Sequence, residues 1–231
     1  MKTELIVALD VPSRQEAINI VEKLSPLVVW YKVGSILFTK EGEALVKALK
    51  DKGCKVFLDL KFFDIPNTVK GVCEVVAKMG VDMFTLHMLG GREMVKAALE
   101  GISPFPQKPL ALGVTILTSM NETTLHEDLR IQESIENTVS HLVKLGLETG
   151  MQGFVCSPHE LSSLRSWVPE NTIFVTPGVR LPGEATGDQK RVMTPKEAHQ
   201  NGANYIVMGR SVYGSSHPLQ TVERILSDIE S

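Results

Sequence analysis

The sequence predicts an α/β protein in which strands and helices alternate along the whole chain. Short, continuous apolar runs recur, and such runs are typical of strands that are buried on both faces of a parallel sheet. Most of these runs are followed by an amphipathic segment, and several of these segments carry a capping signal at the start or a glycine at the end. About eight strand–helix units are present, which is the number in a (β/α)8 TIM barrel.

The expected strands share a short length and a largely apolar character. They are residues 5–9, 28–33, 56–60, 83–87, 109–117, 153–156, 172–176 and 204–208. The first is the most regular apolar run, and the third leads directly into a cluster of charged residues. Each strand is followed by a connection long enough for a helix that returns to the start of the next strand.

The expected helices are recognised by apolar periodicity and by capping residues. The first begins after Ser13, because Ser13 and Glu16 have the spacing of a capping box. The same Ser/Thr-x-x-Glu signal, with proline at the first helical position, occurs after Ser157 and after Thr194. The remaining helices are expected at residues 38–52, 67–79, 92–99, 131–147 and 218–229, and a short helical turn is expected from Gly209.

Nothing in the composition divides the chain, so we expect one domain over residues 1–231. Two long polar connections, 118–130 and 177–193, follow strands and are therefore expected at the catalytic end of the barrel. Loops of this length are commonly lids or binding loops, and glycines give the second loop hinge freedom. A doubly wound open sheet is the competing architecture, and alternation that runs to the C-terminus favours the barrel.

The composition excludes several classes of function. With 43% hydrophobic residues and a formal net charge of −3 among 231 residues, the chain can form a core but has no global basic field for nucleic acid or for an anionic membrane. No apolar stretch approaches the roughly 20 residues of a membrane helix, and the first residues do not resemble a signal peptide. Three cysteines without CxxC spacing suit reduced thiols, so we expect a cytoplasmic protein.

The most informative segment is residues 56–68, in which a strand-like run leads into Asp59, Lys61 and Asp64. A regular strand alternates its faces, so Asp59 and Lys61 are expected to point the same way. Two opposite charges then converge at one end of a strand. Pro66 suits the first turn of the helix that follows.

Other strand ends also carry polar residues. Asp10 follows the first strand, Lys32 lies in the second, and His87 ends the fourth. Each has an ordinary structural interpretation when taken alone, for example a turn cap, a snorkelling lysine or a hydrogen-bonded core histidine. Together they predict a site for a charged ligand, because burying many ionisable groups in one mouth is costly unless a ligand or mutual pairing offsets it.

The last two units predict an anion site. Gly209 and Arg210 open a helical turn after the eighth strand, where backbone N–H groups and a guanidinium can meet a phosphate. Barrels frequently bind phosphate in the loops after strands seven and eight. Arg180 begins the long loop after strand seven and Gln189 lies further along it, so we expect this loop to fold over the phosphate and expel water.

With these residues assembled, the chain resembles the orotidine 5'-phosphate decarboxylase family over essentially its whole length. The resemblance is carried by Leu9-Asp10, Lys32-Val33-Gly34, the segment from Asp59 to Thr68, Thr118-Ser119, the run from Thr176 through Pro177 to Arg180, Gln189, and Gly209-Arg210-Ser211. The Asp59 segment is highly specific, whereas phosphate elements of this kind are shared by many barrels.

The resemblance implies a role for each residue. Lys61 resembles the proton donor, Asp59 the carboxylate beside the leaving CO2, and Lys32 and Asp64 the rest of a charge network. Asp10 and Lys32 resemble ribose contacts, Thr118 and Gln189 contacts to the pyrimidine and the lid, and Arg180, Gly209 and Arg210 phosphate contacts. Pro177 resembles a further substrate-binding residue. Asp64 and Thr68 would reach into a neighbouring subunit, which implies a homodimer with shared sites. No metal or organic cofactor is expected.

Three alternatives remain for comparison. Barrels of the 3-keto-L-gulonate 6-phosphate decarboxylase and hexulose phosphate synthase type also resemble this Asp-x-Lys-x-x-Asp pattern, but they use magnesium and carry an acidic residue where this chain has Lys32. A ribulose-phosphate epimerase is disfavoured because the expected histidine pairs are missing. A catalytically silent phosphate-binding barrel has no reason to retain the costly charges of Asp59, Lys61 and Asp64.

Overall fold

The computed structural model describes residues 2–182 and 193–230. These residues form a closed barrel of eight parallel strands that pair in sequence order, and β8 pairs with β1 to close the ring. The strands are β1 Glu4–Ala8, β2 Trp30–Gly34, β3 Lys55–Phe62, β4 Met83–His87, β5 Leu110–Val114, β6 Gly153–Val155, β7 Ile173–Thr176 and β8 Tyr205–Met208. The predicted TIM-barrel class is confirmed.

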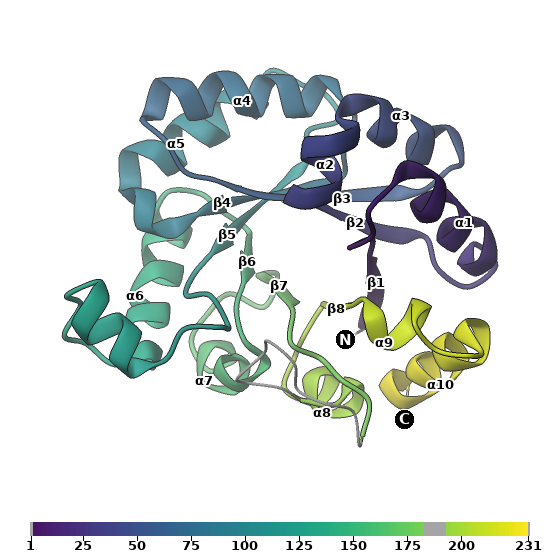
Figure 1. The fold of residues 1–231 in the computed structure, drawn as a ribbon. Coiled ribbons are helices and arrows are strands. Elements are labelled where there is room, and N and C mark those ends of the chain that lie inside the picture. Colours follow the sequence, from purple (N-terminus) through teal and green to yellow (C-terminus); the bar gives the residue numbers. More distant parts are fainter. Residues whose placement is uncertain (1, 183–192, 231) are drawn as a thin grey trace.

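Helices follow the strands and surround the barrel (Figure 1). The α-helices are α1 Arg14–Leu24, α2 Ser35–Glu41, α3 Glu43–Asp51, α4 Pro66–Lys78, α5 Gly91–Ile102, α6 Ile135–Glu148, α7 Leu161–Arg165, α8 Pro195–Gln200, α9 Arg210–Tyr213 and α10 Pro218–Glu230. Three short helical turns are also present: the 3₁₀-helices η1 Met88–Gly90 and η3 Pro158–Glu160, and the π-helix η2 Thr124–Asp128.

Capping residues set the helix starts largely as the sequence predicts. Full capping boxes form at Ser157 and at Thr194, each with proline in the first turn. At Ser13 only half of the box forms. The Ser13 hydroxyl oxygen accepts from the Glu16 N–H, but the Glu16 carboxylate accepts from the Ser13 hydroxyl rather than from its backbone.

Two predicted helix boundaries are wrong. The helix expected over residues 38–52 is two helices, α2 and α3, because Gly42 between them has a φ of 60° that ends the first and begins the second. The helix expected from residue 131 begins at Ile135, where Ser134 accepts a hydrogen bond from the Asn137 N–H. The long loop before it contains the π-helix η2.

The apolar core has two parts. The larger cluster lies between the strands and the helices and includes Leu5, Val7 and Leu9. The smaller cluster takes the alternate residues of the strands, such as Ile6 and Ala8, and fills the inside of the barrel. The other buried residues of this cluster are Trp30, Phe57, Met83, Leu112, Val175 and Val207.

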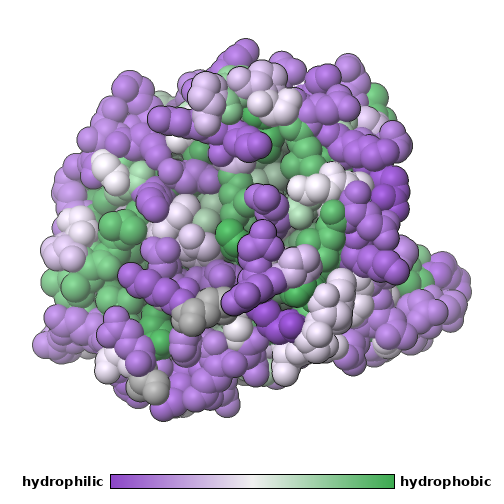
Figure 2. All heavy atoms as spheres, turned by 180° about the vertical axis from the view of Figure 1, so that it is seen from behind, coloured by the Kyte–Doolittle hydropathy of each residue, from purple (hydrophilic) through white to green (hydrophobic). Residues whose placement is uncertain are grey.

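The surface opposite to the view of Figure 1 is hydrophilic over most of its outer rim, and apolar residues gather in patches nearer the middle (Figure 2). Several large apolar side chains of the described residues are exposed, among them Phe63 and Ile65 between β3 and α4. None of the described helices is long and apolar enough to cross a membrane.

Candidate active site

Strand alternation carries charged side chains to the mouth of the barrel. On three strands an interior apolar residue is followed two positions later by a charged one: Ala8 by Asp10, Trp30 by Lys32, and Phe57 by Asp59. Residues two apart on a strand face the same side, so all three charged side chains lie above the interior core. The fold thereby forces neighbouring strands to present charges to one space.

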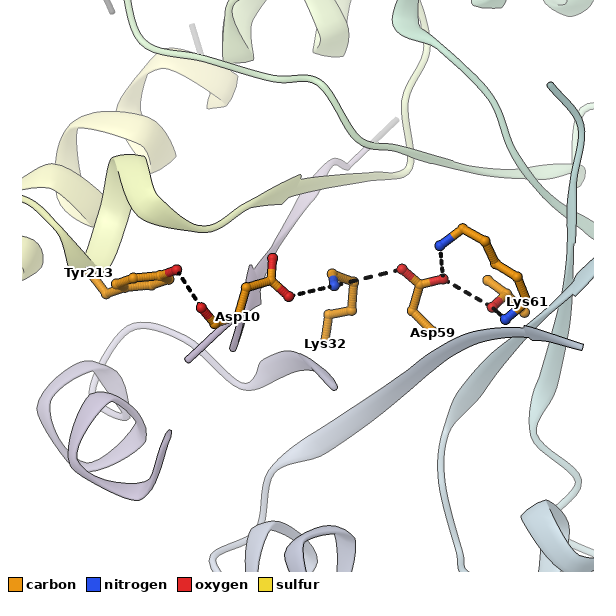
Figure 3. Close-up of polar contacts among 6 residues, drawn as sticks. Asp10, Lys32, Asp59, Lys61 and Tyr213 are labelled. Atoms are coloured by element: carbon orange, nitrogen blue, oxygen red, sulfur yellow. Dashed lines mark hydrogen bonds and ion pairs between the residues drawn. The ribbon is translucent and has the colours of Figure 1, made fainter. Parts of the chain in front are cut away.

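These charges form a row of ion pairs (Figure 3). Lys32 Nζ lies 3.1 Å from Asp10 Oδ1 and 3.6 Å from Asp59 Oδ2, so this ammonium bridges two carboxylates. Lys61 Nζ donates to Asp59 Oδ1 at 2.9 Å. The row therefore alternates in sign, from Asp10 through Lys32 and Asp59 to Lys61.

Asp59 is the most buried carboxylate of the row, with a side chain that is 15% exposed. Burial disfavours its charged form, but Lys32 and Lys61 favour it, as do hydrogen bonds from Lys61 and from the hydroxyl of Thr85. The favourable interactions prevail and hold the pKa of Asp59 below its ordinary value. Asp59 is therefore a carboxylate at neutral pH.

The backbone at Lys61 differs from the regular strand that the sequence suggests. Its φ is 52°, in the left-handed region, and the pairing of β3 with β4 shifts register between Leu58 and Phe62. The expected convergence of Asp59 and Lys61 is confirmed by their 2.9 Å contact. Its predicted cause, simple strand alternation, is wrong, because an irregular backbone delivers the lysine.

The row borders a cavity of about 360 Å³. It is lined by most of the residues that the sequence singles out: Asp10, Lys32, Asp59, Lys61, Thr118, Pro177, Arg180, Gly209 and Arg210. Among its described lining residues are four basic and two acidic side chains, so the cavity carries an excess of positive charge suited to an anionic ligand. Its floor is apolar and includes Phe57 and Val207.

The cavity has two chemically different sides. Lys61 belongs to β3, whereas Arg180 and Arg210 follow β7 and β8, which lie across the ring from β3. A ligand that spans the cavity can therefore contact the alternating charge row with one end and two guanidinium groups with the other. This arrangement suits a molecule with an anionic group at each end.

Two predicted site residues are not brought into this cavity. Asp64, between β3 and α4, and Thr68, in the first turn of α4, are exposed and do not line it. Gln189 lies outside the described residues, as does most of the predicted lid, and its contact with the ligand stays a prediction.

Sequence reasoning assigned no role to three residues that shape the site. Thr85 on β4 bonds both Asp59 and the Lys61 backbone, and a threonine inside a largely apolar strand was the available signal. Tyr213 on α9 donates to the backbone carbonyl of Asp10 at 3.3 Å, which no local pattern indicates (Figure 3). At Gly34 a Cβ would lie 3.1 Å from Lys32 Nζ and 3.2 Å from Asp10 Oδ1, so glycine leaves room for that ion pair.

His87 ends β4 as predicted and lies near the site without joining the charge row. Its ring packs against Phe63 with centroids 5.9 Å apart, and its Nδ1 accepts from the Leu89 N–H at 3.4 Å. Burial and the neighbouring Lys61 lower its pKa below the ordinary value of 6.5. His87 is therefore neutral at pH 7.

The family model described as Orotidine 5'-phosphate decarboxylase / HUMPS family matches residues 3–225. This chain belongs to that family. The family match thus covers all eight strands and both arginines of the cavity.

Individual relatives agree with the family match. The orotidine 5'-phosphate decarboxylase of Dictyoglomus turgidum is 43% identical over 98% of this chain and 95% of its own length. That of Coxiella burnetii is 43% identical over 99% of this chain and 97% of its own. The crystal structure of orotidine 5'-phosphate decarboxylase from Lactobacillus acidophilus superposes with a TM-score of 0.89 at 34% identity and covers both chains completely.

Proposed function

We propose that this protein decarboxylates orotidine 5'-phosphate to uridine 5'-phosphate, the last step of de novo pyrimidine nucleotide synthesis. The observation that carries the proposal is the Lys61 ammonium, held 2.9 Å from the largely buried carboxylate of Asp59 at the edge of a cationic cavity. Membership of the family supports the same reaction.

The two-sided cavity suggests how the nucleotide lies. Arg180, Gly209 and Arg210 would hold the phosphate at the β7 and β8 side, where barrels commonly bind this group. Asp10 and Lys32 would contact the ribose, and Thr118 and Pro177 the pyrimidine, with Gln189 as a further contact from the lid. The pyrimidine C6 would then lie beside Asp59 and Lys61.

Loss of CO2 from C6 leaves an electron pair localised in the ring plane. We assign its stabilisation to the Lys61 ammonium, since a unit charge about 4 Å away contributes on the order of 4 kcal/mol at an effective dielectric near 20. The ammonium is held in place by Asp59 before the reaction begins, so little reorganisation is needed. Lys61 then transfers a proton to C6, which gives the product, and regains a proton from solvent.

Asp59 has a second proposed effect. Its charge lies beside the substrate carboxylate and repels it, and this repulsion disappears as neutral CO2 forms. Phosphate binding at the far side of the cavity supplies the binding energy that holds the substrate carboxylate close to Asp59 despite their repulsion. The reaction thus draws on both sides of the cavity.

Lys32 distinguishes this reaction from that of the magnesium-dependent sugar-phosphate barrels. Its ammonium lies between Asp10 and Asp59, so a cationic side chain occupies the position between the two carboxylates. A spectrophotometric assay of orotidine 5'-phosphate loss, with and without a chelator, tests the proposal. We expect equal rates in both conditions. Turnover of a sugar phosphate that stops on chelation, without loss of orotidine 5'-phosphate, would refute it.

We further propose that the protein acts as a homodimer with shared sites. Asp64 and Thr68 are exposed and lie outside their own cavity, and the same segment exposes two large apolar side chains, Phe63 at 62% and Ile65 at 67%. Covering these apolar side chains is favourable, and a two-fold dimer would cover both copies at once. Asp64 would then complete the charge row of the partner.

Mixing two inactive variants tests this sharing. In a heterodimer of Lys61→Ala and Asp64→Ala subunits, one of the two sites regains both residues, so random subunit exchange should restore about a quarter of wild-type activity. Each variant alone should remain inactive. A mixture that stays inactive although sedimentation shows dimers that exchange subunits would contradict the shared site.

The family match and the full-length relatives support treating residues 1–231 as one catalytic domain. A cytoplasmic location is also proposed, because the three cysteines, Cys54, Cys73 and Cys156, are buried and form no disulfide among the described residues, as is usual in reducing compartments. Cell fractionation with an antibody to the chain would test the location.

A further inference from the structure

The left-handed backbone conformation of Lys61 requires stabilising contacts from its surroundings. Among the described residues only Lys61 and Arg130 combine a side chain with a positive φ, and at Lys61 the value is 52°. Long side chains in this region cost roughly 1–2 kcal/mol, and such conformations persist only where the surroundings fix them. The shifted pairing of β3 with β4 means that regular ladder bonds do not supply this support.

Thr85 supplies the support from β4. Its hydroxyl oxygen accepts from the Lys61 backbone N–H at 2.8 Å and lies 3.0 Å from Asp59 Oδ1. An N–H can only donate, and a carboxylate can only accept, so the hydroxyl proton must be directed at Asp59. Thr85 is fully buried, so water does not compete for these bonds.

The three residues form a closed loop of hydrogen bonds. Lys61 Nζ donates to the same Asp59 Oδ1 that accepts from Thr85, at 2.9 Å. One oxygen atom, Asp59 Oδ1, therefore positions both parts of Lys61. It bonds the ammonium directly, and it is connected to the backbone N–H through the Thr85 hydroxyl. A shift of Thr85 would change both distances together.

Other buried threonines of the barrel wall bond differently. The Thr115 hydroxyl donates to the backbone carbonyl of Val155 on the neighbouring strand at 3.0 Å, which ties two strands together. Thr115 does not line the cavity, and it is as fully buried as Thr85. It is therefore a matched control for the loss of a buried hydroxyl in the same barrel.

We propose that Thr85 is a positioning residue for decarboxylation, which fixes the Lys61 ammonium against Asp59 by holding the left-handed backbone of Lys61. This inference rests on the function proposed above. It predicts a defect in turnover rather than in nucleotide binding, because Thr85 is not among the residues that line the cavity. A displacement of about 1 Å in a reacting group can lower a rate by about 100-fold.

The test compares Thr85→Val, which keeps the shape and removes the hydroxyl, with Thr85→Ser and Thr115→Val. We expect Thr85→Val to lower kcat by about 100-fold while the Kd of uridine 5'-phosphate, measured by calorimetry, changes less than threefold. Thr85→Ser should retain kcat within about fivefold, and Thr115→Val should retain both quantities. Thr85→Ala, which removes the same hydroxyl without adding a methyl group, should repeat the loss.

Crystal structures of Thr85→Val and of the wild type give a readout that does not depend on activity. We expect the Lys61 φ to become negative, or its Nζ to move away from Asp59, in the variant alone. A variant with wild-type kcat and an unchanged Lys61 would overturn the inference, as would equal losses in Thr85→Val and Thr115→Val. If the wild type does not decarboxylate orotidine 5'-phosphate, the proposed function fails, whereas the geometry of Lys61 still decides the role of Thr85.

Discussion

Replacing Asp59 by asparagine tests whether a charge between two ammonium groups drives the reaction. Asparagine keeps the shape and an acceptor for the Thr85 hydroxyl, and it removes only the charge. In the native site Asp59 Oδ1 lies 2.9 Å from Lys61 Nζ, and Oδ2 lies 3.6 Å from Lys32 Nζ. The variant therefore leaves two cations near each other without the anion that separates them.

The size of the effect follows from these distances. Each attraction is on the order of 4 to 6 kcal/mol at an effective dielectric near 20. The Lys61 side chain is 38% exposed, so solvent screens part of its attraction. If about 3 to 4 kcal/mol of the remainder is lost at the transition state, kcat falls about 100- to 1000-fold. Because repulsion of the substrate carboxylate is also lost, KM should fall together with kcat.

The assay is the loss of orotidine 5'-phosphate at saturating substrate, with the Kd of uridine 5'-phosphate measured in parallel. The product lacks the carboxylate, so its affinity should change only a few-fold. Asp51→Asn, which removes an exposed partner of Lys47 on α3, is the control and should behave as wild type. A kcat of Asp59→Asn within tenfold of wild type would refute the reasoning, as would a loss of product affinity as large as the loss of kcat.

Three further predictions concern other parts of the molecule. Arg210→Ala should lower kcat/KM for the phosphorylated substrate by about 100-fold or more and leave turnover of the nucleoside unchanged, and an equal loss with both would contradict a phosphate contact. Arg165→Met should lower the free energy of unfolding, measured in urea, by about 2 to 4 kcal/mol, because the guanidinium donates to the carbonyls of Gly202 and Thr172 and lies 4.6 Å from the Phe174 ring. The control Arg92→Met breaks an exposed ion pair and should lower it by less than about 1 kcal/mol. Equal losses in the two variants would show that the buried contacts of Arg165 add no stability. Because the pKa of His87 is lowered in the folded protein, the unfolded chain binds the imidazole proton first as pH falls below about 6.5. The free energy of unfolding of the wild type should therefore fall relative to that of His87→Gln between about pH 7 and pH 5. If the two plots of this free energy against pH are parallel, the pKa of His87 is not lowered by folding.

Much of the fold could be predicted because local patterns and tertiary packing agree. The bounds of β4, Met83–His87, match the expected run, and capping residues at Ser157 and Thr194 begin their turns as predicted. The break between α2 and α3 could not be predicted with the same ease. A glycine inside an amphipathic pattern is often tolerated, and only the positive φ of Gly42 shows that the helix ends there.

In the candidate site, too, some residues could be predicted from local sequence patterns and others depend on tertiary structure. Asp10, Lys32 and Asp59 could be placed because strand alternation fixes their direction once the strands are known. The left-handed backbone of Lys61 and the hydroxyl of Thr85 depend on how β3 and β4 align, and this register is a tertiary property. Residues that act from a neighbouring strand are therefore difficult to find by reading one segment.

The role of Lys61 is tested most directly by single-turnover measurement with Lys61→Ala. This variant removes the ammonium and leaves Asp59, Lys32 and both cavity arginines in place. We predict that it binds uridine 5'-phosphate measurably and releases no CO2 from orotidine 5'-phosphate above the uncatalysed rate. Substantial CO2 release by this variant would contradict the claim that the lysine stabilises and protonates the carbanion.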